Sequence, residues 1–300
     1  IKNQDITVKL HRASTMFWKT SIIFILSLNE VCQSKSDLRI FNGRDAKEGE
    51  FPYVVILVQF DNHTLMMKQP RRVCTGAIIS EDWVLTAGQC CKNEFMPPID
   101  TMYLWIGNFT EYPSLGSKLL KKVKKLISHP TSGSSYFNLR NDIGLALVEK
   151  LPINSVGRLS GVDHLTLIGL PVTFIGSGRT NKPGNYRLMP LQVGEVGIVP
   201  CNDPRRKESS ICTIPKCDDR LNNGLPGDSG GPLLYDGRII GVMSGLLPNK
   251  GNATSSIAVS TAVSPFLDWI HLVIQNKRDQ ITRSKPSINK KAIVEYDSFK

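Results

Sequence analysis

Short hydrophobic runs rich in β-branched residues recur along this chain, and they limit the folds that it can adopt. They lie at residues 54–58, 77–79, 172–175, 239–242 and 257–259. Residues that favour turns separate them, for example Asp61 with Asn62, and the Lys-Pro-Gly-Asn stretch at 182–185. Runs this short, with turns between them, are typical of antiparallel β-barrels and not of βαβ units. At 300 residues the chain can bury a large core.

The amino-terminal region has the pattern of a leader. A lysine precedes an apolar run at 22–28, as in a secretory signal peptide, and Cys32 and Ser34 are small residues suited to a cleavage site. The apolar run is far shorter than the ~20 residues needed to cross a bilayer, so we expect no membrane anchor. The pattern predicts an upstream artefact, a signal peptide and a short propeptide, at residues 1–15, 16–34 and 35–39.

Three motifs supply candidate catalytic residues. Gly-Asp-Ser-Gly-Gly-Pro at 227–232 is a glycine-rich turn around Ser229. Asn-Asp-Ile-Gly-Leu-Ala-Leu at 141–147 contains Asp142, and Val-Leu-Thr-Ala-Gly-Gln-Cys at 84–90 contains Gln89.

In this order the motifs resemble those of the chymotrypsin/trypsin family, in which the base precedes the aspartate and the serine comes last. The stretches at 39–43 and 74–79 also resemble family landmarks, and the resemblance covers residues 40–274. It implies an all-β fold of two packed, antiparallel, six-stranded β-barrels. A C-terminal α-helix should follow at 265–274, where Phe266, Ile270, Val273 and Ile274 share one helical face.

The resemblance fails at one catalytic position, because Gln89 stands where the family has its histidine. A carboxamide nitrogen is not basic near neutral pH, so it can hydrogen-bond the Ser229 hydroxyl but cannot accept its proton. Asp142 would keep its place without an imidazole to orient. The family's oxyanion hole would fall on the backbone N–H groups of Gly227 and Ser229. Other histidines are expected to be exposed or structural; they are His63, His129, His164 and His271.

The family's activation device is present in the sequence. A cut between Arg39 and Ile40 would free an ammonium group that can pair with the carboxylate of Asp228. The specificity pocket, in contrast, departs from the family pattern. Asn223 occupies about the position of the aspartate of trypsins, Ser244 belongs to an altered strand, and Ala258 replaces a glycine; Leu225 replaces a cysteine.

Cysteines and glycosylation motifs fit passage through the secretory pathway. The resemblance implies the disulfide pairs Cys74 with Cys90, and Cys201 with Cys212. It has no counterpart for Cys91 or Cys217, which could pair with each other, pair with another chain or stay free. Asn-x-Thr sequons predict N-glycosylation at Asn62, Asn108 and Asn252.

The formal net charge is +11, and basic residues concentrate at 118–125 and 275–300. We expect the second stretch to be a disordered tail. Basic patches attract polyanions such as sulfated glycans, although lysines also protect strand edges. No aromatic platform accompanies them, so we expect no nucleic-acid partner.

Together these features predict a secreted, monomeric, non-catalytic serine protease homologue that needs no cofactor or metal. Its partner would be an extracellular protein: a protease, an inhibitor or a substrate. One alternative is an active serine endopeptidase with an unusual base. Another is an extracellular polyanion-binding module.

Overall fold

A computed structural model describes the greater part of the chain after residue 43. The described residues are 44–60, 69–92, 94, 96–133, 140–152, 155–178, 188–201, 209–215, 228–248 and 256–284. All of them belong to the compact unit formed by residues 38–300. The expected upstream artefact, signal peptide and propeptide lie outside the described residues.

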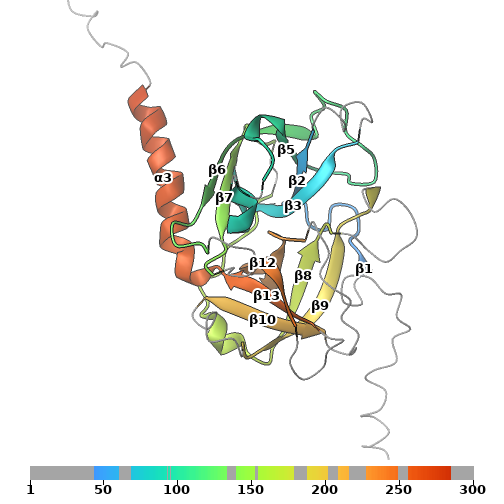
Figure 1. Ribbon diagram of the computed structural model, residues 1–300, viewed down its shortest axis with the longest axis vertical. Helices are drawn as coiled ribbons and strands as arrows, with labels where there is room; N and C mark the ends of the chain where they lie inside the picture. The colour runs from blue at the N-terminus through green and yellow to red at the C-terminus, as the bar shows by residue number, and fades with distance from the viewer. Residues whose placement is uncertain are drawn as a thin grey trace, which may run out of the picture. The chain divides into compact units, whose positions relative to one another are not determined.

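The first barrel is built from hydrophobic strands that pair antiparallel with their neighbours and close on themselves (Figure 1). In barrel order they are β2 (Val54–Gln59), β3 (Arg71–Ile78), β4 (Trp83–Thr86), β7 (Gly144–Val148), β6 (Leu120–Ser128) and β5 (Met102–Trp105). Pairing of β5 with β2 closes the ring. Every residue of β2 is buried, as its run of β-branched and leucine residues predicts.

The second barrel closes in the same way, because β8 pairs with both β11 and β9. Its strands in order are β8 (Pro171–Gly176), β9 (Gln192–Val199), β10 (Ser210–Pro215), β13 (Ser256–Ala262), β12 (Arg238–Pro248) and β11 (Pro232–Tyr235). A short strand, β1 (Arg44–Asp45), adds to the edge of β9. The predicted fold of two closed, six-stranded antiparallel barrels is therefore confirmed.

One hydrophobic cluster links the barrels. It contains most of the first barrel's interior together with Ile175, Leu191, Leu234 and Ile239 from the second-barrel half of the chain. A smaller cluster around Phe174 fills the rest of the second barrel. Short 3-10 turns connect the strands at η3 (Gly88–Cys91), η4 (Ile99–Thr101), η5 (His164–Leu167) and η8 (Ser264–Phe266).

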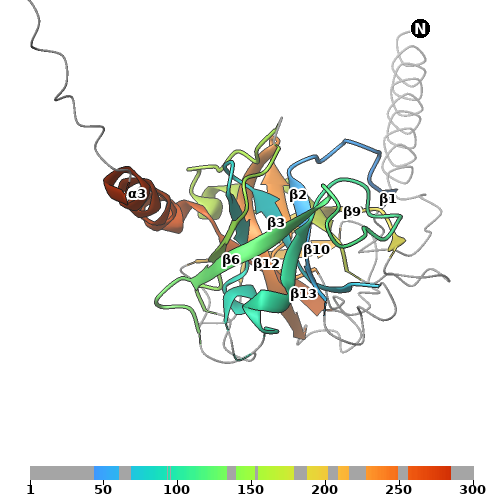
Figure 2. The ribbon, with the colours of Figure 1, turned by 90° about the horizontal axis from the view of Figure 1, so that it is seen from above.

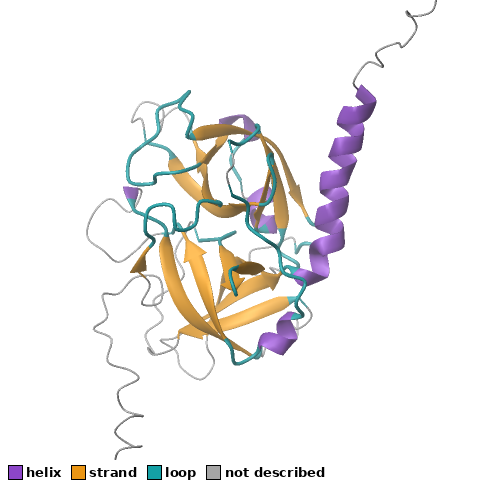
Figure 3. Cartoon of the chain, turned by 180° about the vertical axis from the view of Figure 1, so that it is seen from behind, coloured by secondary structure: helices purple, strands orange, loops and turns teal. Residues whose placement is uncertain are grey.

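The last element is α3 (Leu267–Ser284), which follows η8 directly and runs along the outside of the barrels (Figures 1 and 3). Phe266 and Ile270 are buried against the core, as the helical pattern predicts. Among the described residues, no helix is long and apolar enough to cross a bilayer.

The helix continues past its expected end at Ile274, so residues 275–284 are helical where we expected a disordered tail. This segment contains neither glycine nor proline, and most of its residues are tolerated in helices. Pro286 follows, and the residue before a proline disfavours helical geometry. The helix therefore ends near the proline, and residues 285–300 lie outside the described residues.

Candidate functional site

Ser229 lies in a tight turn that presses against the first barrel. The Thr75 backbone N–H donates to the Ser229 carbonyl oxygen at 2.8 Å. Gly230 has a φ of +88°, and a Cβ atom there would collide with the Thr75 carbonyl and the Thr86 hydroxyl. Only glycine fits this position, which explains why the turn is rich in glycine. Gly227, the other expected oxyanion donor, lies outside the described residues.

Strand pairing brings Gln89 and Asp142 together. Gln89 lies in η3 directly after β4, and Asp142 lies just before β7. These two strands pair with Thr86 opposite Gly144. The Gln89 backbone N–H consequently donates to Asp142 Oδ1 at 2.6 Å.

The Gln89 side chain faces three acceptors. Its Nε2 lies 2.6 Å from the Ser244 carbonyl oxygen, 3.2 Å from Asp142 Oδ2 and 3.3 Å from Ser229 Oγ. A carbonyl or carboxylate oxygen can only accept, so the amide nitrogen, and not its oxygen, must point at this cluster. The atom that faces the Ser229 hydroxyl is therefore a hydrogen-bond donor.

Asp142 is 1% exposed, and Gln89 lies beside it where the family has an imidazole. Burial raises its pKa to about 6, against hydrogen bonds from Gln89 and Ser244 and the charge of Lys92, which lower it. The ammonium group of Lys92 itself bonds the carbonyl oxygens of Ser132 and Gly133. Ionising the Asp142 carboxyl in this buried position therefore costs more free energy than ionising it in water.

Two residues of the expected specificity pocket are described. The Ser244 hydroxyl hydrogen-bonds the Thr261 hydroxyl at 2.9 Å, next to a register shift between β12 and β13. Ala258 pairs with Leu246 on these strands and is buried in the smaller cluster of the second barrel. Asn223 and Leu225 lie outside the described residues.

Asp228 is buried beside the serine turn. Its Oδ1 accepts a hydrogen bond of 2.7 Å from the Gly178 backbone N–H. A Cβ atom at Gly178 would overlap the carboxylate, so the backbone approaches it closely. Arg39 and Ile40, the expected cleavage site, lie outside the described residues.

Both disulfides implied by the resemblance are formed, between Cys74 and Cys90 and between Cys201 and Cys212. Cys91 is a buried free thiol. Burial raises its pKa to about 12, so it stays protonated and unreactive. Cys217 lies outside the described residues.

The described histidines make contacts away from this site. His129 packs edge-on against Phe266 and Trp269 and hydrogen-bonds Thr131. His164 is buried, and neither of its ring nitrogens has a hydrogen-bond partner. His271 is exposed on α3, and His63 lies outside the described residues. No group of three or more metal-ligating side chains is found in the part of the chain that the structure describes.

Sequence reasoning missed Arg72, a largely buried side chain between the barrels. Its guanidinium donates to the carbonyl oxygens of Ser177, Phe109 and Met189 at 2.9–3.2 Å. It also stacks over the Trp105 ring. Burial lowers its pKa to about 10. Arg72 follows Arg71 at the start of β3, so its sequence context does not distinguish it from a surface arginine.

Of the expected glycosylation sites, Asn108 is described and exposed, whereas Asn62 and Asn252 lie outside the described residues. In the basic stretch at 118–125, Lys118, Lys124 and Lys125 are exposed.

Comparison with known proteins matches the sequence of the chain to one family. The family model described as Trypsin matches residues 40–270. Chymotrypsin-like elastase family member 1 of Rattus norvegicus is 25% identical over 252 residues, which cover 80% of this chain and 91% of the relative. Serine protease SP24D of Anopheles gambiae is 28% identical over 242 residues, covering 79% and 82%. The Bos taurus elastase family member is 27% identical over 213 residues, covering 67% and 78%.

Proposed function

Because the chain belongs to the trypsin family of serine proteases, we propose that it is a secreted member that does not cleave peptides and acts by binding other extracellular proteins. The observation that carries this proposal is the contact between Gln89 Nε2 and Ser229 Oγ. A serine becomes a nucleophile only when a neighbouring group removes its proton. Here the neighbouring atom, Gln89 Nε2, donates a hydrogen bond and cannot accept that proton.

The size of the effect argues against catalysis. Losing the base of a serine triad costs about 10⁶ in turnover, or about 8 kcal/mol of activation free energy. None of the described histidines contacts Ser229: His129 packs against Phe266 and Trp269, His164 is buried beside Asp163, and His271 is exposed on α3. A backbone oxyanion hole alone leaves too little rate for useful peptide cleavage.

The same residue supports a binding role, because Gln89 preserves the shape of the site. Its amide connects Asp142 of the first barrel to the Ser244 carbonyl and the Ser229 hydroxyl of the second. The cleft thus keeps a protease-like arrangement without a working nucleophile. Such a surface suits the capture of a protease inhibitor, a protease substrate or a partner protease without consuming it.

Secretion is supported by the leader pattern and by the two disulfides, which persist in oxidising compartments. We further propose that cleavage after Arg39 lets the new ammonium of Ile40 pair with Asp228. Amino-terminal sequencing after limited digestion with a trypsin-like protease tests this step: the new terminus should be Ile40, and its absence would contradict the step.

The main test is active-site labelling of the cleaved protein with a serine-directed fluorophosphonate, together with digestion of a broad peptide library. Ser229→Ala is the matched control. We expect no labelling and no cleavage above the control. Turnover that Ser229→Ala abolishes would overturn the non-catalytic proposal.

The exposed lysines of β6 favour a second function, the binding of polyanions. Lys124 and Lys125 are exposed neighbours in this strand. If they form a site, retention on a sulfated resin should fall when both are changed to glutamine, and it should fall with added salt.

A further inference from the structure

A pocket lies next to the first strands of the chain and is lined by none of Gln89, Asp142, Ser229 or Ser244. Its volume is about 430 Å³, within the range of small-ligand sites. Phe51, Pro52, Phe109, Pro190 and Leu191 supply much of its apolar lining, and Asn108 also lines it.

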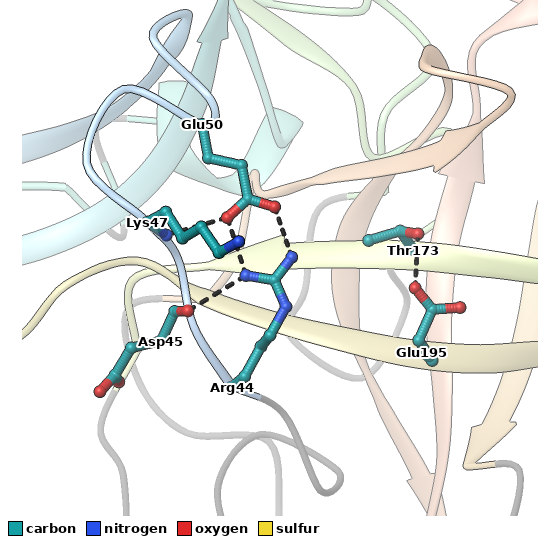
Figure 4. A network of polar contacts seen from close by, with 6 residues as sticks. All are labelled: Arg44, Asp45, Lys47, Glu50, Thr173 and Glu195. Atoms are coloured by element: carbon teal, nitrogen blue, oxygen red, sulfur yellow. Dashed lines mark hydrogen bonds and ion pairs between the residues drawn. The ribbon is translucent and has the colours of Figure 1, made fainter.

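One wall of the pocket is a turn held in a fixed shape (Figure 4). The Arg44 guanidinium makes a two-point ion pair with the Glu50 carboxylate, which also accepts the Lys47 backbone N–H at 2.9 Å. The hydrogen bonds from Arg44 lower the pKa of Glu50 to about 2. Gly49 supplies a positive φ of +70° within the turn.

The turn is also tied to the barrel. The Ala46 backbone N–H donates to the Leu191 carbonyl at 2.7 Å, beyond the pairing of β1 with β9. The pocket is therefore preformed, and binding a ligand there would cost little free energy for ordering this wall.

Asn108, which also lines the pocket, has a side-chain amide held by hydrogen bonds. Its Oδ1 accepts hydrogen bonds from the Thr110 backbone N–H at 2.8 Å and from the Thr110 hydroxyl at 2.7 Å. The two acceptor contacts orient the amide, and its Nδ2 is the atom left for attachment. Phe109, which lies between Asn108 and Thr110 in the sequence, is buried and packs edge-on against the Trp105 ring. The Trp105 indole N–H donates to the Asn108 backbone carbonyl oxygen at 3.0 Å.

We propose that Asn108 carries an N-linked glycan and that its first N-acetylglucosamine packs in this pocket against Phe51 and Pro190. This proposal rests on the secretory route proposed above. The oligosaccharide would come from a polyprenyl-pyrophosphate donor: a bond forms between Asn108 Nδ2 and sugar C1, the C1–O bond to pyrophosphate breaks, and Nδ2 loses one proton.

The chemistry of the pocket fits a sugar. A pyranose ring presents C–H groups on its faces and hydroxyls at its edge. Here Phe51, Phe109 and Pro190 supply partly or fully buried apolar surface to the lining, while Lys47, Glu48 and Thr110 in the same lining are exposed. Covalent attachment at the same pocket gives the sugar a high effective concentration, so weak contacts suffice to hold it.

The test uses the full chain with Asn62→Gln and Asn252→Gln, expressed behind a host secretion signal in cells that make oligomannose glycans. The added signal makes the result independent of residues 16–34 and of the catalytic proposal. Peptide mapping should find the glycan on Asn108. Thr110→Ala should remove it, and the matched variant Thr110→Ser, which keeps the sequon, should retain it.

Occupancy of the pocket is measured by thermal unfolding after trimming. An endoglycosidase that leaves one N-acetylglucosamine should keep the full Tm, whereas complete removal should lower it by about 2–4 °C. In a Phe51→Ala background the two treated forms should unfold at the same temperature, which isolates the contact between sugar and pocket. An unmodified Asn108, or equal Tm values for the two forms with Phe51 intact, would overturn the proposal.

Discussion

The amide nitrogen of Gln89 lies 2.6 Å from the carbonyl oxygen of Ser244, and this bond joins the two barrels across the site. It is shorter than the contacts of the same nitrogen with Asp142 and Ser229. Gln89 therefore acts first as a structural link between barrels. The residue that stands in the position of the catalytic base thus also links the two barrels at this site.

Gln89→His should restore a base without restoring an efficient protease. An imidazole beside Asp142 can activate Ser229, so the variant should react with a small fluorophosphonate. Peptide cleavage should stay weak, because Ala258 replaces a glycine of the family's specificity pocket and its methyl group should narrow that pocket. Misplacement of a substrate by ~1 Å can cost about 10²-fold.

Labelling rates and kcat/KM on a peptide library check this expectation, with Gln89→His/Ser229→Ala as the control. Efficient peptide cleavage by the single revertant would show that Gln89 is the only lesion.

Asp142 should make the protein less stable as the pH rises. Its folded pKa is raised to about 6, while an unfolded Asp titrates near 3.9. Between these values the folded state binds more protons, so the free energy of unfolding falls with rising pH and the loss is complete above about pH 6. Two pKa units correspond to a loss of about 3 kcal/mol.

Urea unfolding of wild type and Asp142→Asn from pH 4 to 8 measures this loss. As the pH rises, the free energy of unfolding of the wild type should fall by about 2–3 kcal/mol relative to that of Asp142→Asn. A difference that is independent of pH would contradict the raised pKa.

Much of this architecture could be predicted from the sequence because its determinants are local. The β-branched runs at 54–58 and 172–175 became β2 and β8. The resemblance to the trypsin family also implied that Asp142 would face Gln89, and the two residues are in contact. The Gln89–Ser244 bond could not be predicted in this way, because its acceptor is a backbone carbonyl that any residue could supply.

Other features depend on packing that sequence patterns do not show. Arg72 looks like a surface residue by type, yet the carbonyl groups around it come from Phe109, Ser177 and Met189, far apart in the sequence. The end of α3 was misplaced because the apolar stripe stops near Ile274, whereas helix propensity continues until Pro286. Hydrophobic periodicity marks the packed part of a helix and not its full length.

Arg72→Met should destabilise the fold substantially. The variant keeps an apolar stem but leaves three carbonyl oxygens of the inter-barrel region without their donor. Buried groups that lose a partner cost about 1–3 kcal/mol each, so we expect a total loss of about 2–4 kcal/mol after partial relaxation.

The neighbouring Arg71 provides a matched control, since it is exposed and, within the described residues, its side chain hydrogen-bonds the Gln59 amide oxygen. Arg71→Met removes the donor of one acceptor, where Arg72→Met removes the donor of three, so it should cost less, about 1 kcal/mol, in the same urea titration. Equal losses in the two variants would show that Arg72 does not hold the barrels together.

His164 should give stability a second pH dependence, opposite in sign to that of Asp142. Its ring is buried without hydrogen-bond partners, and burial lowers its pKa against the opposing charge of Asp163. The unfolded chain therefore binds a proton more readily, and stability is lost as the pH falls below about 6.5. His164→Phe should remove this loss and flatten the dependence of Tm on pH between 5 and 7. The comparison is made in an Asp142→Asn background, where the titration of Asp142 is absent. If His164→Phe does not change the slope of Tm against pH there, the buried imidazole is not the source of that slope.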